Sequence, residues 1–299
     1  MEKPQPLTKG DKIALISTAR KITLQELEPA ISTLKLWGLE PVFGKNLFKI
    51  NHQFAGSTED RIADLQETLE NPKIKAILCV RGGYGTVQLI DSIDFSNFKK
   101  NPKWIIGYSD VTVLHNHINK NVGIATLHAT MPINFTTNTK EALESLKETL
   151  FGALPIYTTE NHQLNRLGEA TGELVGGNLS IIYSLTGTPS QLDTKGKILF
   201  LEDLDEYLYH IDRMMMNLKR AGMLTNLKGL IVGGMSDMKD NTVPFGKSAL
   251  EIIFDAVKEY HYPVCFDFPA GHVNDNRSLI MGSEVNLVVD KDWTTLEFI

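Results

Sequence analysis

The sequence has few cysteines, and they do not suggest chemistry. Only two of its 299 residues are cysteines, Cys79 and Cys265, and each lies inside a hydrophobic run. We expect buried, unreactive thiols rather than a disulfide or a catalytic thiol, because free cysteine commonly behaves as a small core hydrophobe. No cysteine pair and no HExxH spacing indicates a structural or protease zinc site.

Positive charge and long apolar runs are also scarce. The formal net charge at pH 7 is −6, whereas nucleic acids and anionic membranes are bound by a basic face, so we expect neither partner. No apolar run approaches the roughly 20 residues that a membrane helix needs. Charges at Glu2, Lys3 and Lys9 leave no room for the apolar segment of a signal peptide, and we therefore expect a cytoplasmic protein.

The first half of the chain alternates short apolar runs with helical patterns. Strand-like runs occur at 13–17, 41–43, 76–80 and 104–106. Between them, apolar residues recur at three- and four-residue steps, as they do on one face of a helix. Such alternation predicts an α/β fold with a Rossmann-like parallel sheet covered by helices on both faces. We assign residues 1–150 to this domain.

The second half differs in pattern. Residues 151–172 are predicted to form a linker, because Pro, Thr and Asn replace the periodic apolar positions. Residues 173–299 contain fewer helices and late consecutive strands, which favours a smaller, strand-rich domain with barrel-like curvature. Within it, the Gly-Gly-Asn segment at 176–178 is interpreted as a turn and helix start.

A candidate nucleophile lies at the end of one apolar run. Residues 104–106 lead into Gly-Tyr-Ser-Asp at 107–110 and then into an amphipathic pattern. A sharp strand-to-helix turn would expose the Ser109 hydroxyl above free helix N–H groups that can stabilise an oxyanion. Val111 replaces the second glycine of the common G-x-S-x-G elbow. The alternative is that Ser109 or Asp110 only caps the helix.

A serine nucleophile needs a base, and a base needs a carboxylate. His272 lies in a loop directly after an apolar run, where catalytic groups often occur, although a lone loop histidine can equally be a surface residue. His128 also follows a strand-like run. Glu202 follows the apolar run 198–201 and begins a cluster of acids, for which a charged strand end is the alternative.

The glycine-rich segment at 81–85, Arg-Gly-Gly-Tyr-Gly, follows another apolar run. Without side chains, its backbone N–H groups can approach a ligand closely. It lacks the G-x-G-x-x-G spacing and the Walker lysine of phosphate loops. An oxyanion hole and a plain tight turn remain the two interpretations.

Together these motifs resemble the LD-carboxypeptidases, which include the muramoyl tetrapeptide carboxypeptidases. The resemblance runs through nearly the whole chain, over segments 81–85, 107–110, 176–179, 201–203 and 271–272. It implies a triad with Ser109 as nucleophile, His272 as base and Glu202 as the residue that orients it. It also implies an oxyanion hole formed by the N–H groups of Gly83 and Asp110, two domains with the triad across their cleft, and a homodimer.

The resemblance further implies acyl transfer on a muropeptide. Ser109 would attack an L-centre carbonyl and His272 would protonate the departing D-alanine amine, with no metal or organic cofactor. The D-alanine carboxylate needs a cation, for which Arg81 and Arg277 are the candidates. Arg277 has alternative partners in Asp275 and Glu284. Tyr84, in the same loop as Arg81, completes the expected substrate-binding residues.

Three other functions remain open. The related microcin-immunity enzymes cleave a peptide–nucleotide antibiotic with the same triad, but commonly carry a longer catalytic loop than this compact chain. A two-domain protein that only binds a small ligand would not require Ser109, Glu202 and His272 at the ends of three elements. A Rossmann-type nucleotide enzyme would require the phosphate-binding fingerprint that is missing here.

Overall fold

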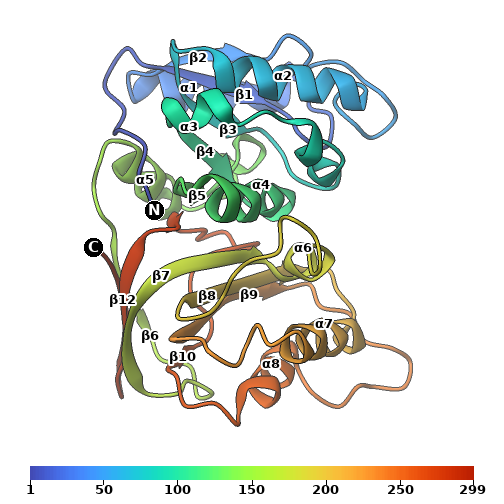
Figure 1. Ribbon diagram of the computed structural model, residues 1–299, viewed down its shortest axis with the longest axis vertical. Helices are drawn as coiled ribbons and strands as arrows, with labels where there is room; N and C mark the ends of the chain where they lie inside the picture. Colours follow the sequence, from blue (N-terminus) through green and yellow to red (C-terminus); the bar gives the residue numbers. More distant parts are fainter.

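Two β-sheets organise the chain (Figure 1). The computed structural model describes residues 1–299. The first sheet has six strands in the order β11-β5-β4-β3-β1-β2, and the second has seven in the order β10-β9-β8-β7-β12-β13-β6. This confirms the predicted α/β fold, with a parallel-strand sheet in one half and a strand-rich sheet in the other.

Five parallel strands form most of the first sheet. They are β1 (Lys12–Ile16), β2 (Glu40–Phe43), β3 (Ile74–Cys79), β4 (Trp104–Gly107) and β5 (Thr126–His128). Their spatial order, β2-β1-β3-β4-β5, is that of flavodoxin-like doubly wound folds. The order reverses between β1 and β3. Ligands of such sheets bind beyond the carboxyl ends of the strands at this switch point.

Helices cover both faces of the first sheet, as predicted. On one face α1 (Leu24–Leu36) and α5 (Lys140–Leu150) pack their apolar side chains against the sheet. The other face carries α2 (Thr58–Glu70), α3 (Ser96–Lys100) and α4 (Thr112–His117). Capping boxes at Thr23 and Ser57 begin α1 and α2 by satisfying free backbone N–H groups. Shorter 3-10 or π turns span Thr86–Gln88, Ile90–Ser92, Ser109–Val111, Ile118–Val122 and Pro132–Asn134.

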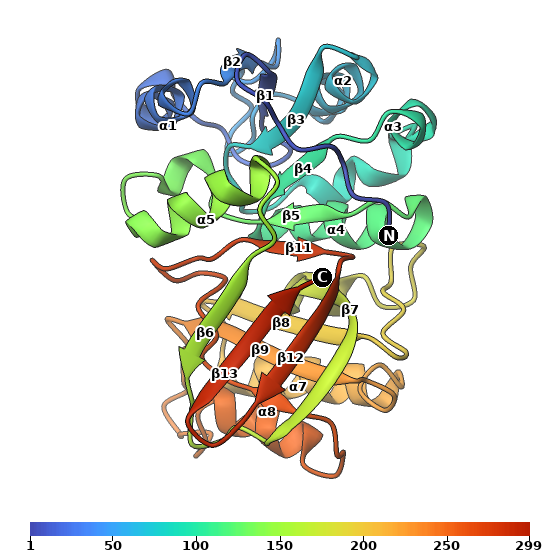
Figure 2. The ribbon, with the colours of Figure 1, turned by 90° about the vertical axis from the view of Figure 1, so that its left-hand side faces the viewer.

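The second sheet curls toward a barrel (Figure 2). Its parallel part joins β7 (Gly168–Asn178), β8 (Ile198–Leu204), β9 (Gly229–Ser236) and β10 (Val264–Cys265). Its antiparallel part joins β7 to β12 (Glu284–Val289), β13 (Trp293–Phe298) and β6 (Ile156–Glu160). Arg166, in the segment between β6 and β7, exchanges backbone hydrogen bonds of 2.9 and 3.1 Å with Val264 of the edge strand β10.

Three helices belong to the second half: α6 (Leu179–Ser184), α7 (Leu208–Arg220) and α8 (Ala249–Val257). Met214 and Met215 of α7 are buried in a cluster with apolar residues of α8 and the sheet. These two methionines therefore serve as core packing, whereas the next residue, Met216, is exposed. None of the helices in the structure has the length and apolar character needed to cross a membrane.

Two sequence interpretations of this region need revision. Residues 151–172, expected to be a linker, contain β6 and the start of β7. Of the turn and helix start predicted at 176–178, the turn was wrong, because Gly176 and Gly177 lie inside β7, whereas the helix start was right, because Asn178 caps α6. A Cβ on Gly176 would lie 2.0 Å from the carbonyl oxygen of Phe200, and one on Gly177 would lie 2.6 Å from Thr112 Oγ1. These glycines thus allow β8 and α4 to approach closely rather than reversing the chain.

One of the hydrophobic clusters spans both halves. Strand β11 (Leu279–Met281) comes from the second half of the chain but pairs antiparallel with β5 of the first sheet (Figure 2). One buried cluster contains Leu15 of the first sheet together with Phe200 and Leu287 of the second. The carboxyl ends of β4 and β8 are thus held near the same junction.

The predicted burial of both cysteines is confirmed. Cys79 and Cys265 are free thiols within the core, and burial raises the pKa of each to about 12. At neutral pH they are protonated and therefore poor nucleophiles.

Candidate active site

Ser109 occupies a strained turn between β4 and α4. Its φ is +62°, in the left-handed region that non-glycine residues rarely adopt. This is the geometry of a nucleophile elbow, in which the sharp turn exposes the hydroxyl above the sheet. Gly82 lies beside it, since a Cβ on Gly82 would be 3.1 Å from Ser109 Oγ. The missing side chain leaves space next to the hydroxyl.

The Asp110 side chain holds the glycine-rich loop against this elbow. Its carboxylate accepts hydrogen bonds from the N–H of Thr86 at 2.9 Å and from Thr86 Oγ1 at 2.7 Å. Thr86 Oγ1 is also 2.7 Å from Thr18 Oγ1. Burial raises the pKa of Asp110. These bonds keep the loop that contains Gly83 next to Ser109, and the role of Gly83 and Asp110 N–H as an oxyanion hole stays a prediction.

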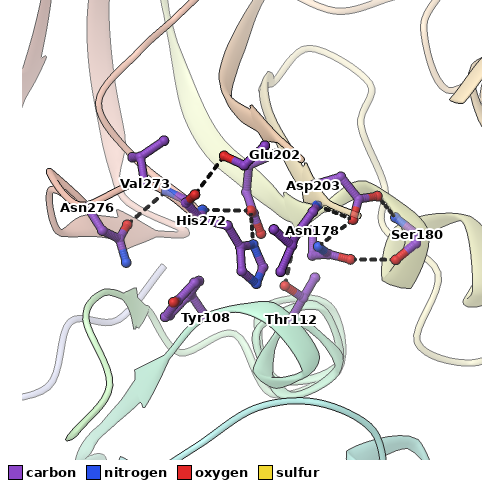
Figure 3. Close-up of polar contacts among 12 residues, drawn as sticks. Tyr108, Thr112, Asn178, Ser180, Glu202, Asp203, His272, Val273 and Asn276 are labelled. Carbon is purple, nitrogen blue, oxygen red and sulfur yellow. Dashed lines mark hydrogen bonds and ion pairs between the residues drawn. The ribbon is translucent and has the colours of Figure 1, made fainter. Parts of the chain in front are cut away.

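Glu202 and His272 form a buried pair (Figure 3). Glu202 lies near the end of β8 and is fully buried, and its Oε2 accepts a 2.6 Å hydrogen bond from His272 Nδ1. The preceding residue, Gly271, has a φ of +102°, and a Cβ there would lie 2.6 Å from Glu202 Cβ. Only glycine lets the loop cross Glu202 so closely.

The catalytic-loop backbone around His272 is also braced. Gly271 N–H donates to Asn276 Oδ1 at 2.8 Å, and Ser236 Oγ donates to the His272 carbonyl at 2.7 Å. His272 is therefore held through its ring nitrogen, its backbone carbonyl and the N–H of the preceding residue. Such support limits how far the ring can drift from Glu202.

The pair sets the charge state of both partners. Burial favours a neutral Glu202, but the charge and hydrogen bond of His272 outweigh it and lower the pKa of Glu202. Burial likewise favours a neutral His272, but the charge and hydrogen bond of Glu202 outweigh it and raise the pKa of the imidazole. An ionised Glu202 accepts the Nδ1 proton, which leaves Nε2 as the basic nitrogen of the neutral ring.

The imidazole is directed toward the elbow. The ring centroids of His272 and Tyr108, the residue before Ser109, are 4.8 Å apart. In Figure 3 the ring points from its loop toward Tyr108 and Thr112. The structure thus brings Ser109, Glu202 and His272 to one junction. The Ser109 hydroxyl has no hydrogen bond to the ring, and catalytic hydrogen bonds often form only with substrate bound. The three catalytic roles stay predictions.

A chain of hydrogen bonds that the sequence did not reveal runs through Thr112, Asn178, Asp203 and Ser180 at this junction. Thr112 Oγ1 of α4 accepts a 3.0 Å hydrogen bond from the Asn178 N–H at the end of β7. Asn178 Nδ2 donates to Asp203 Oδ1 at 3.0 Å, and Ser180 N–H donates to Asp203 Oδ2 at 2.9 Å. Burial raises the pKa of Asp203 to about 7. The only signals in the sequence were the Gly-Gly-Asn motif and the acid cluster, which carry no information about partners.

Both arginines among the expected substrate-binding residues already have carboxylate partners. The Arg81 guanidinium is 3.7 Å from a Glu26 carboxylate oxygen. Arg277 donates hydrogen bonds to both carboxylate oxygens of Asp275, the alternative partner considered from sequence. Tyr84 is half exposed in the glycine-rich loop, close to Arg81 in the chain. Substrate binding by these residues stays a prediction.

The remaining candidate histidine is buried behind the site. The His128 ring lies between Tyr108 and Phe200, with centroids 5.7 and 5.0 Å away, and burial lowers its pKa to about 3. It is neutral and has no contact with solvent. His115 is also buried and hydrogen-bonds to the carbonyl of Gly107 at 2.9 Å. It therefore braces the end of β4 immediately before the elbow.

Comparison with known proteins decides the family. The LD-carboxypeptidase N-terminal domain model matches residues 13–129, and the C-terminal domain model matches residues 171–287. The chain belongs to the LD-carboxypeptidase family. A probable murein peptide carboxypeptidase from Bacillus subtilis is 37% identical, over 99% of this chain and 94% of its own length. The murein tetrapeptide carboxypeptidase from Pseudomonas aeruginosa is 28% identical, over 89% of this chain and 90% of its own.

Two solved structures share the whole fold. The crystal structure of muramoyltetrapeptide carboxypeptidase from Oxalobacter formigenes has a TM-score of 0.88 and 28% identity, covering 96% of this chain and 98% of that one. A microcin C7 self-immunity protein, MccF, in complex with aspartyl sulfamoyl adenosine, has a TM-score of 0.87 and 22% identity, covering 98% of both chains. The second likeness concerns the fold alone. The resemblance seen in the sequence motifs is thus confirmed at the level of the family.

Proposed function

We propose that this LD-carboxypeptidase is a serine hydrolase that cleaves the L,D-peptide bond releasing the terminal D-alanine of murein tetrapeptides. The observation that carries the proposal is the buried Glu202–His272 pair, whose imidazole faces the elbow occupied by Ser109. The names of the Bacillus subtilis and Pseudomonas aeruginosa relatives support murein peptides as the substrate class.

The proposed reaction needs only side chains, backbone and water. Ser109 Oγ attacks the carbonyl carbon before the D-alanine, while His272 Nε2 takes the hydroxyl proton. The oxyanion is stabilised by the N–H groups of Gly83 and Asp110. His272 then gives its proton to the departing amine, the C–N bond breaks, and D-alanine leaves. Water, deprotonated by the same imidazole, hydrolyses the acyl-enzyme and regenerates Ser109.

The cellular setting follows as part of the same proposal. An enzyme that trims muropeptides during wall recycling would work on soluble fragments in the cytoplasm, without nucleic-acid or membrane partners. We propose a homodimer on the basis of the family resemblance, with a Rossmann-like domain at 1–150 and a barrel-like domain at 173–299 that also includes β6 and the start of β7 from 151–172. Light scattering on the purified protein would give its mass in solution.

One experiment tests both the reaction and its stereochemistry. The protein is incubated with a murein tetrapeptide and with the matching peptide that ends in L-alanine, and products are identified by mass spectrometry. We expect release of D-alanine from the first peptide only, and no release by the Ser109→Ala variant. Failure on both peptides would contradict the proposal. Cleavage of an aminoacyl sulfamoyl adenosine instead would favour an immunity-type hydrolase, and binding of the tetrapeptide without turnover would favour a binding protein.

A further inference from the structure

An arginine outside the predicted site, Arg20, packs its side chain against the glycine-rich loop at 81–85. Arg20 follows β1, and a Cβ on Gly83 would lie 2.6 Å from Arg20 Cδ and 2.7 Å from its Nε. Gly83 has a φ of +114°, a backbone conformation that favours glycine. The Arg20 side chain therefore rests directly on the residue expected to supply an oxyanion-hole N–H.

The backbone of Arg20 is held by hydrogen bonds, whereas its guanidinium has no partner within the protein. Its carbonyl accepts a 2.6 Å hydrogen bond from Ser17 Oγ, and Arg20 forms a β-bridge with Phe54. The guanidinium has no hydrogen bond and no carboxylate within ion-pair distance in the structure, and the residue is exposed. Arg81 and Arg277, by contrast, are each paired with a carboxylate of the protein. Arg20 is thus the arginine at this loop whose charge remains available to an anion.

Its position in the sheet is where ligands of such folds bind. Arg20 follows β1 and Gly83 follows β3, the two strands between which the strand order reverses. Ser109 packs against the preceding residue of the same loop, because a Cβ on Gly82 would lie 3.1 Å from Ser109 Oγ. Gly82 packs against Ser109, and the next residue, Gly83, packs against Arg20. The candidate nucleophile and the free guanidinium therefore lie beside adjacent residues of the loop.

This separation suits a C-terminal residue. In a peptide, the carboxyl carbon of the last residue is only three bonds from the scissile carbonyl carbon, which is about 3–4 Å. A guanidinium that binds the carboxylate must then lie just beyond the oxyanion hole, with N–O distances of about 2.7–2.9 Å. We propose that Arg20 binds the α-carboxylate of the terminal D-amino acid and so restricts the enzyme to free C-termini. This inference rests on the proposed carboxypeptidase function.

The test compares a tetrapeptide with a free C-terminal carboxylate and the same peptide as its C-terminal amide. For the unmodified protein we expect kcat/KM for the acid to exceed that for the amide by roughly 10- to 100-fold, the range of a charge-assisted hydrogen bond. Arg20→Met keeps the apolar stem on Gly83 but removes the charge. We expect it to lower kcat/KM for the acid by a similar factor and to leave the amide unchanged, so that the preference disappears. Arg20→Lys should retain part of the preference.

The matched control is Lys21→Met, which removes the same charge one position along the chain and should keep the preference for the acid. An equal loss on acid and amide in Arg20→Met would overturn the inference, because it would indicate a structural role of the stem. An unchanged preference would overturn it as well.

Failure of the proposed function would have a different signature. In that case the unmodified protein would release no D-alanine from the acid. Calorimetric binding of the acid and the amide to Ser109→Ala, with and without Arg20→Met, would still test the contact without turnover. Acid-selective binding that vanishes with Arg20 supports the inference, and binding that is equal for acid and amide in both variants overturns it.

Discussion

A single oxygen of Glu202 contacts both the ring and the backbone of His272. Its Oε2 accepts hydrogen bonds from His272 Nδ1 at 2.6 Å and from the His272 N–H at 3.2 Å. The carboxylate therefore sets the tautomer of the ring and the path of its loop at the same time. A substitution at Glu202 should alter proton affinity and ring position together.

Removing the Ser109 hydroxyl should abolish turnover without unfolding the protein. Ser109→Ala is expected to lower kcat for D-alanine release by about 10⁴-fold or more, the usual consequence of losing a triad member. The hydroxyl forms no hydrogen bond within the protein, and alanine tolerates the φ of +62° about as well as serine does. Circular dichroism and thermal unfolding should match those of the unmodified chain. Substantial remaining turnover would rule out Ser109 as the nucleophile.

The rate should fall on the acidic side at a pH above 6.5, the ordinary value for histidine. Nε2 of His272 must be unprotonated to act as a base, and the charge and hydrogen bond of Glu202 outweigh burial and raise the pKa of the imidazole. Activity is therefore lost as the pH falls through that raised value. The pH profile of kcat/KM reports it for the free enzyme.

The Glu202→Gln variant provides the matched comparison. Removing the carboxylate charge leaves burial as the dominant influence, so the pKa of His272 should move down. NMR titration of the imidazole in the Ser109→Ala background, with and without Glu202→Gln, measures the shift without relying on turnover. The same imidazole pKa in both proteins would contradict the described coupling.

A methyl group at Gly83 should lower kcat strongly and lower the free energy of unfolding only modestly. Gly83→Ala would place a Cβ against the Arg20 side chain at a φ of +114°, so the Arg20 stem would have to shift and the loop beside Ser109 would carry backbone strain. Gly196→Ala is the control, since Gly196 has a φ of +69° but nothing within 4 Å of the added Cβ. Each substitution is expected to cost about 1 kcal/mol or more of backbone strain, and only Gly83→Ala to lower kcat strongly. Equal kcat values for the two variants would argue against a role for this loop in the reaction.

The hydrogen bond between Thr112 and Asn178 should stabilise the packing of the two halves. Thr112→Val removes the acceptor of the buried Asn178 N–H, and an unsatisfied buried donor costs about 1–3 kcal/mol. Urea unfolding should show this loss of stability. Thr171→Val, which alters an exposed hydroxyl that donates to Asn286, should change the free energy of unfolding far less. Similar free energies for both variants would show that the interdomain bond contributes little.

Much of the fold could be predicted from local patterns. The apolar runs at 13–17, 76–80 and 104–106 correspond closely to β1, β3 and β4, because buried parallel strands need continuous apolar residues. Strand β7 was missed because its glycines indicate a turn when only the neighbouring residues are considered. Their actual purpose, close contact with Phe200 and Thr112, involves residues far away in the chain.

The sequence alone determined which residue types stand at the ends of the apolar strands, and that was enough to identify Ser109, Glu202 and His272 as candidates. Only the tertiary structure decided how they meet: Glu202 rather than Asp203 contacts His272, across 70 positions of chain. It also decided that Arg20 keeps a free charge while Arg81 and Arg277 do not. The reason is physical, because strand ends separated in sequence converge only when sheets pack, and a charge is free or paired according to neighbours that this packing supplies.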